Sequence, residues 1–173
     1  LWRRWRWVRL RVNIAGVVGE GSNGQKEETI LVPVAPPDVA ADIVERVLPG
    51  LDLAALTWHE APARSRRRSP IQWQRLAVAW DDSVFVARSG RLTRRTSVIP
   101  HVRTQSVRVT QGPWERALLL ASVHVDSTPG PVSITGRHLD AAQARAVADE
   151  QVVRAGRGRA DDRTIRWADP DRD

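Results

Sequence analysis

Leu120-Ala121-Ser122-Val123-His124-Val125 (LASVHV) is the segment from which the predicted architecture follows, because Trp7-Val8-Arg9-Leu10-Arg11-Val12 (WVRLRV) can be laid on it. Each segment is followed by a glycine-containing loop, a short apolar strand and an Ala- and Val-rich helix. An internal repeat constrains the whole fold, and a fold assigned without it would be wrong. Strand-like sequence precedes the second copy, whereas nothing equivalent precedes the first. The repeat therefore predicts two modules of one architecture, the first of which starts in mid-domain.

Short strand-like segments separated by turn residues fill the chain from Gln74 to Thr135. Asp81-Asp82 and Ser89-Gly90 are typical of tight turns between such strands. A helix is predicted over Asp140–Val153, where Asp140 and Gln143 have capping-box spacing. Strands followed by one helix predict an α+β fold that is mainly β: a small barrel or sandwich closed by its C-terminal helix.

The first copy contributes a hairpin and a helix that starts at Pro36-Pro37-Asp38, with Asp38 as the expected N-cap. Pro49-Gly50 ends this helix. Residues 51–70 are predicted to be a linker, because Arg64 and the run Arg66-Arg67-Arg68 are typical of a solvated segment.

Composition restricts the chemistry. The 173 residues carry a formal charge of +7, and Lys26 is the sole lysine, so arginine supplies almost all of the positive charge. Such a charge favours phosphate-bearing partners, either nucleic acid or anionic lipid. The absence of Cys excludes disulfides, thiolate nucleophiles and Cys-based zinc sites. The longest apolar run, Ala117 to Val123, falls far below the roughly 18 residues that a spanning helix needs.

No arrangement of catalytic residues is apparent. Gly19–Gly24 spells G-x-G-x-x-G, but it leads into a strand rather than a helix, and the following Glu27 and Glu28 would repel phosphate. Asp81-Asp82 is interpreted as a turn rather than a cation site. The histidines and serines lack a neighbouring base or nucleophile in sequence. We therefore expect no catalysis, no cofactor and no metal. The four histidines, His59, His101, His124 and His138, are expected to have structural roles.

The segment Arg91–Val107 (RLTRRTSVIPHVRTQSV) resembles the bacterial PH-like, membrane-flanked domain of YdbS/YdbT-like proteins. The family has a basic strand, an Ile/Val-Pro step and an Arg-x-Gln-Ser-Val strand. The resemblance continues through Gln111-Gly112-Pro113 and Arg116 to the Leu120–Val125 strand, and then to the Asp-x-x-x-Ala helix start at residues 140–144. The family often has a second Arg and a Leu-Gly after the turn, where this chain has Ala117-Leu118-Leu119, so a double-Arg site is not carried over.

The resemblance implies the following organisation. Residues 1–50 are the C-terminal part of a truncated PH-like domain, 51–70 the linker, 71–153 a complete PH-like domain, and 154–173 a disordered tail. Members of the family are bacterial membrane proteins with such domains beside paired transmembrane helices and facing the cytoplasm. The resemblance thus implies a parent protein in the cell membrane, with this fragment itself water-soluble on the cytoplasmic side.

The function expected from these observations is a non-catalytic scaffold or interaction module. Guanidinium groups on what should be adjacent strands would contact anionic lipid headgroups or an envelope partner protein. The expected interaction face consists of Arg94, Arg95, Arg103, Gln105, Arg108 and Arg116. The alternative is a basic nucleic-acid-binding module, but with one Phe and no Tyr the chain has few residues for base stacking.

Overall fold

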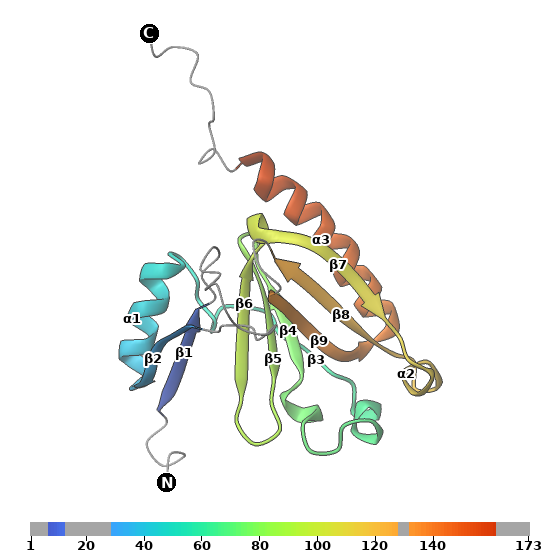
Figure 1. Cartoon of the computed structure of the whole chain (residues 1–173). Coiled ribbons are helices and arrows are strands. Elements are labelled where there is room, and N and C mark those ends of the chain that lie inside the picture. Colours follow the sequence, from blue (N-terminus) through green and yellow to red (C-terminus); the bar gives the residue numbers. More distant parts are fainter. Residues whose placement is uncertain (1–6, 13–28, 128–131, 162–173) are drawn as a thin grey trace, which may run out of the picture. The chain divides into compact units, whose positions relative to one another are not determined.

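The computed structural model describes residues 7–12, 29–127 and 132–161 (Figure 1). The chain divides between Ala55 and Leu56 into two compact units. Gly19–Gly24, Trp2, Trp5 and residues 162–173 lie outside the described residues.

The first unit contains a hairpin followed by a helix. Strands β1 (Val8–Val12) and β2 (Thr29–Ala35) pair antiparallel, and α1 (Pro37–Val47) follows directly. The N-cap of α1 is Pro36, so the prediction of Asp38 as N-cap is wrong. Pro37 takes the first helical position. Proline suits that position, because its fixed φ is helical and an N–H there would have no partner within the helix. Asp38 lies in the first turn, where its charge favours the helix dipole.

The second unit contains two sheets. The first sheet has the order β3-β4-β5-β6 and the second the order β7-β8-β9. A short 3-10 helix, η4 (His101–Arg103), lies between β6 and β7, where the chain passes from one sheet to the other. The strand bounds are β3 (His59–Glu60), β4 (Ala77–Trp80), β5 (Val84–Ser89), β6 (Arg95–Pro100), β7 (Thr104–Thr110), β8 (Leu120–Ser127) and β9 (Val132–Asp140).

The core of this unit lies between the two sheets and is covered by α3 (Ala141–Asp161). Strands β4, β5 and β8 are buried at consecutive positions, so both of their faces are covered. Gly136 of β9 lies at a close approach of the two sheets, because a Cβ there would collide with the buried Val78 side chain of β4. The core includes Val78, Phe85 and Ile99 from the first sheet, Val123, Val125 and Ile134 from the second, and Ala144, Val147 and Ala148 from the helix.

This architecture confirms the predicted α+β, mainly β fold with a C-terminal helix, although the two sheets do not form a closed barrel. Two boundaries differ from the prediction. The helix continues to Asp161, so a disordered tail from Arg154 is wrong for residues 154–161. The expected linker over residues 51–70 contains β3 and the 3-10 helix η2 (Ala63–Arg67), because the chain from Leu56 onward is part of the second unit.

Buried polar side chains attach α3 to the corner between the sheets. His101 is 1% exposed; its Nε2–H donates to the Asp81 carbonyl at 2.9 Å, and its Nδ1 accepts from Gln151 Nε2 at 2.9 Å. The same Gln151 amide donates to Thr104 Oγ1 at 3.1 Å. At the other end of the helix, Asp140 accepts from the backbone N–H of Ala142, which confirms Asp140 as the cap.

We predict that acidification destabilises the second unit. Burial lowers the pKa of His101 below its ordinary 6.5, and this effect outweighs the hydrogen bond to the Asp81 carbonyl, which by itself would raise the pKa. The unfolded chain therefore binds more protons below about pH 6.5. The free energy of unfolding should decrease by up to about 1.4 kcal/mol per pH unit for each such histidine. Burial lowers the pKa values of His124 and His138 as well, with the same sign.

Urea unfolding, followed by circular dichroism at a series of pH values from slightly alkaline to mildly acidic, measures this effect. The carboxylates with lowered pKa values, such as Asp140, lose their contribution only at more acidic pH. A free energy of unfolding that stays constant across the histidine range would contradict the neutral, buried state of His101.

Candidate interaction surface

The structure does not bring all six residues of the expected interaction face together. Arg94 and Arg95 lie where β6 begins, whereas Arg103 follows its other end, across a strand of six residues. Strands β6 and β7 also belong to different sheets, so the prediction of adjacent strands is wrong. The chain changes sheet at η4, directly after Pro100.

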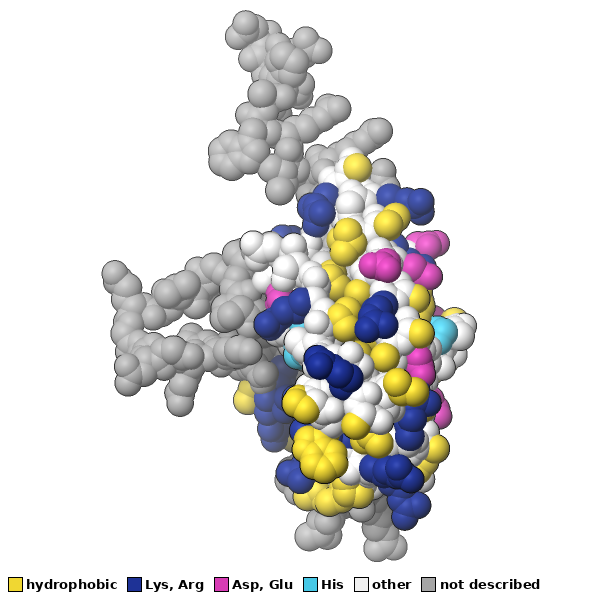
Figure 2. Space-filling model, turned by 90° about the vertical axis from the view of Figure 1, so that its right-hand side faces the viewer, with side chains coloured by type: hydrophobic (Ala, Val, Ile, Leu, Met, Phe, Trp, Pro, Cys, Tyr) yellow, Lys and Arg dark blue, Asp and Glu magenta, His cyan; other side chains and the backbone are white. Residues whose placement is uncertain are grey.

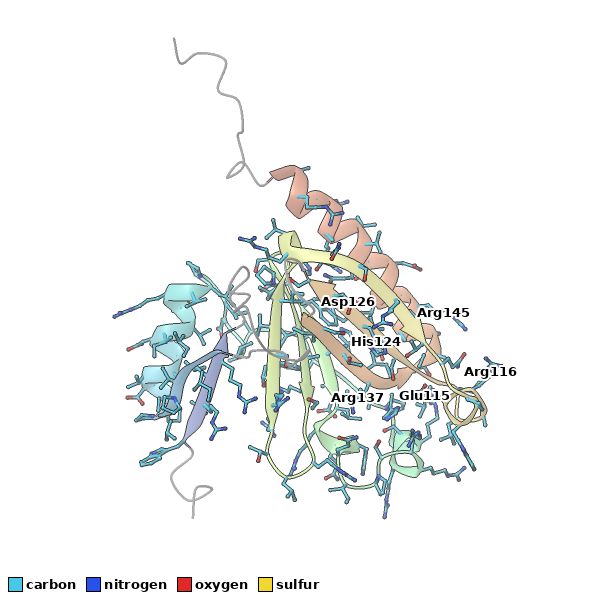
Figure 3. All side chains as sticks on the ribbon, viewed as in Figure 1. Glu115, Arg116, His124, Asp126, Arg137 and Arg145 are labelled. Carbon is cyan, nitrogen blue, oxygen red and sulfur yellow. The ribbon has the colours of Figure 1, made fainter. Side chains whose placement is uncertain are left out.

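Three of the six residues, Arg103, Gln105 and Arg108, lie on or next to β7. The β7–β8–β9 sheet carries polar side chains that contact one another, among them His124 and Asp126 (Figure 3). Asp126 accepts from Ser106 Oγ at 2.8 Å and lies 3.5 Å from Arg108 Nε. This sheet therefore already offsets part of the charge of Arg108. On the same sheet, the His124 ring lies between two hydroxyls: its Nε2 is 2.9 Å from Thr110 Oγ1 and its Nδ1 is 3.1 Å from Thr135 Oγ1.

The short helix α2 (Pro113–Ala117) is attached to the second sheet through Glu115. The Glu115 carboxylate accepts from Gly112 N–H at 2.9 Å and from Ser122 Oγ at 2.8 Å, and it lies 2.9 Å from His138 Nδ1. Burial raises the pKa of Glu115, but these hydrogen bonds outweigh it and leave the pKa below its ordinary value. The group thus stays charged and fixes α2 in place.

The same three side chains could be mistaken for a catalytic triad. A triad needs the serine hydroxyl to give its proton to histidine. Here Ser122 Oγ donates to Glu115 and accepts from the His138 backbone N–H, while His138 contacts the same carboxylate oxygen. The arrangement orients α2 and gives Ser122 no base. Sequence reasoning missed this cluster, because Glu115, Ser122 and His138 come from three separate elements.

The arginine run predicted to be solvated is partly a structural connection. Arg64 donates from Nε to the Leu118 carbonyl at 2.8 Å and from Nη2 to the Leu119 carbonyl at 3.1 Å, and it forms an ion pair with Asp140. At the other end of the same loop, Arg75 donates to the Arg91 carbonyl of the β5–β6 turn. The β3–β4 loop is thereby joined both to the α2–β8 connection and to the β5–β6 hairpin.

These connected segments carry the most exposed apolar side chains of the described chain. Leu92 is 76% exposed, Trp114 75%, Leu119 66% and Ile71 63%, and no other large hydrophobic side chain among the described residues exceeds 60%. Glu115 points inward from α2, which leaves its neighbour Trp114 in solvent.

Seven exposed arginines lie on the same three connected segments as these four side chains. Figure 2 shows hydrophobic side chains gathered with Lys and Arg side chains at the lower end of the visible face. We call this surface the basic–apolar end. It consists of the four apolar residues Ile71, Leu92, Trp114 and Leu119 and the seven exposed arginines Arg66, Arg67, Arg68, Arg91, Arg94, Arg95 and Arg116. Three of the six predicted residues, Arg94, Arg95 and Arg116, belong to it.

Within the basic–apolar end, the surface is hollowed between the β3–β4 loop and α2. Arg67, Arg68, Trp114, Ala117 and Leu118 line the hollow. The sequence indicated the arginine run, but it did not indicate that α2 would lie beside it.

The described part of the chain contains neither a metal-ligand cluster nor a membrane-spanning helix. No group of three or more His, Asp or Glu side chains there is arranged to hold a metal ion. No helix formed by the described residues has both the length and the apolar character needed to cross a membrane.

We predict that Glu115→Ala releases α2 from the sheet. The substitution leaves Ser122 and His138 without their shared acceptor, and losing a buried hydrogen-bond partner costs about 1–3 kcal/mol. Amide hydrogen exchange of residues 112–119 should become faster. Arg116→Ala in the same helix is the matched control and should leave exchange unchanged; equal exchange in the two variants would contradict the role of Glu115.

Comparison with known protein families gives a match to the bacterial PH domain over residues 46–151. The match covers every strand of the second unit, and it includes residues 51–70, which were expected to be a linker. No curated protein and no solved structure matches the chain. PH domains are in general non-catalytic modules that mediate lipid or protein interactions.

Proposed function

Because this chain belongs to the bacterial PH domain family, we propose that it is a non-catalytic interaction module that contacts an anionic membrane surface through its basic–apolar end. The proposal places the parent protein in the bacterial cell membrane with this module on the cytoplasmic side. The resemblance of Arg91–Val107 to YdbS/YdbT-like proteins, whose domains flank transmembrane helices, supports that placement.

The observation that carries the proposal is that the four most exposed large apolar side chains and seven exposed arginines lie on three segments that Arg64 and Arg75 join. An arginine near an anionic leaflet contributes about 1 kcal/mol. Tryptophan and leucine side chains beside arginines lie favourably at the boundary between headgroups and acyl chains. One surface thus offers both attractions that peripheral membrane binding uses.

The apolar part of this surface distinguishes a membrane from nucleic acid. Phosphates of either partner would attract the arginines. Leu92, Leu119 and Ile71, however, have no aromatic face on which a base could stack. If the protein bound nucleic acid, these aliphatic side chains would stay exposed to water. If it bound a bilayer, they would be buried at the interface and removed from water. The structure therefore favours the membrane over the nucleic-acid alternative.

Vesicle co-sedimentation tests the proposal. The protein should bind vesicles that contain phosphatidylglycerol and not vesicles of pure phosphatidylcholine. Raising the salt from about 0.1 M to about 1 M shortens the screening length from about 10 to about 3 Å and should weaken binding strongly. Leu92→Ser and Trp114→Ser should each reduce the partition coefficient about tenfold, since each removes part of a side chain's apolar transfer energy.

Val152→Ser and Val153→Ser provide the matched controls, because these α3 side chains are also exposed, at 57% and 52%, but lie outside the basic–apolar end. They should leave vesicle binding unchanged. A protein that ignores phosphatidylglycerol vesicles, or that shifts DNA in a gel at physiological salt more strongly than it binds vesicles, would overturn the proposal.

A further inference from the structure

The hollow between the β3–β4 loop and α2 has a polar side and an apolar side. Arg67 and Arg68 supply the polar side, and Trp114, Ala117 and Leu118 supply the apolar side. Both arginines are exposed, and among the described residues neither forms an ion pair.

The walls of this hollow are held in a fixed relation. Arg64 lies one helical turn before Arg67 and Arg68. It donates hydrogen bonds to the carbonyls of Leu118 and Leu119 on the opposite wall. Glu115 fixes α2 from beneath through Gly112, Ser122 and His138. The hollow is therefore built by interactions that do not use Arg67 and Arg68, whose guanidinium groups stay available.

The carboxylates near the hollow are already engaged. Asp140 pairs with Arg64 and caps α3, and the Arg64 hydrogen bond holds the pKa of Asp140 below its ordinary value. Glu115 is turned into the protein. Neither one neutralises Arg67 or Arg68, so the hollow retains two positive charges beside an indole ring and two aliphatic side chains.

Guanidinium forks match the oxygen spacing of phosphate and bind it with charge-assisted hydrogen bonds. A free anion has no apolar part that could contact Trp114, Ala117 and Leu118. A glycerophospholipid does, because glycerol and the first acyl carbons follow its phosphate. We propose that the hollow binds one anionic glycerophospholipid, with Arg67 and Arg68 on its phosphate and Trp114, Ala117 and Leu118 against its glycerol–acyl junction. This inference rests on the proposed membrane contact and gives that contact a discrete lipid site.

A charge-matched pair of variants separates a discrete site from general attraction. Arg67→Gln/Arg68→Gln and Arg94→Gln/Arg95→Gln each remove two positive charges from the basic–apolar end, but only the first pair lines the hollow. On phosphatidylglycerol vesicles at equal ionic strength, the first variant should lose about tenfold more affinity than the second, because it also loses direct phosphate hydrogen bonds. Circular dichroism checks that both variants fold.

Short-chain phosphatidylglycerol below its micelle concentration tests the site without a bilayer. The Trp114 indole N–H signal in NMR should shift saturably with this lipid, and the shift should be absent in Arg67→Gln/Arg68→Gln. Glycerol 1-phosphate and inorganic phosphate should bind at least tenfold more weakly, since they lack the acyl part that the apolar side contacts.

The outcomes separate the two proposals. Equal losses by the two double variants on vesicles would overturn the lipid site while leaving the membrane contact intact. Inorganic phosphate that binds as tightly as the short-chain lipid would overturn the choice of a lipid as ligand. A wild-type protein that binds no anionic vesicle would overturn the proposed function itself.

Discussion

The guanidinium of Arg64 connects three parts of the second unit that are far apart in sequence. It reaches the carbonyls of Leu118 and Leu119 after α2, and the Asp140 carboxylate at the start of α3. Without this connection the β3–β4 loop would lose its direct hydrogen bonds to the segment that follows α2. The basic–apolar end and its hollow exist because one arginine of the run is used internally while its neighbours are left exposed.

A second constraint works alongside it from the core. The two sheets bury their apolar faces against each other, and α3 covers the remaining edge. This packing places β5–β6, the β3–β4 loop and α2 where the Arg64 and Arg75 contacts can join them. Packing of apolar side chains thus determines where the loops lie, and the arginine contacts determine which surface they present.

The sequence predicted the strand-rich fold, the closing helix and its Asp140 cap, because alternation and capping are local patterns. It did not predict that β6 and β7 lie in different sheets, since the corner at Pro100 depends on packing between distant segments. It predicted the arginine run to be solvated, because charge alone does not reveal the carbonyls that Arg64 meets. Trp114 shows the same limit: its exposure follows from the inward turn of Glu115, whose partners Ser122 and His138 are remote in sequence.

The tandem organisation stays a proposal. The first unit has a hairpin and then a helix, the same order as β8, β9 and α3, which supports two modules of one architecture. The family match covers residues 46–151 and so begins within α1.

The central claim is that the second unit meets a membrane with its basic–apolar end, and spin-label depth measurements test it most directly. Since the chain has no Cys, single labels can be placed at Ile71, Thr93 and Ala146 through cysteine substitutions. On phosphatidylglycerol vesicles, labels at the first two positions should become accessible to oxygen and protected from a water-soluble nickel complex, while the label at Ala146 on α3 stays in water. Protection at Ala146 with no change at Ile71 and Thr93 would contradict the account.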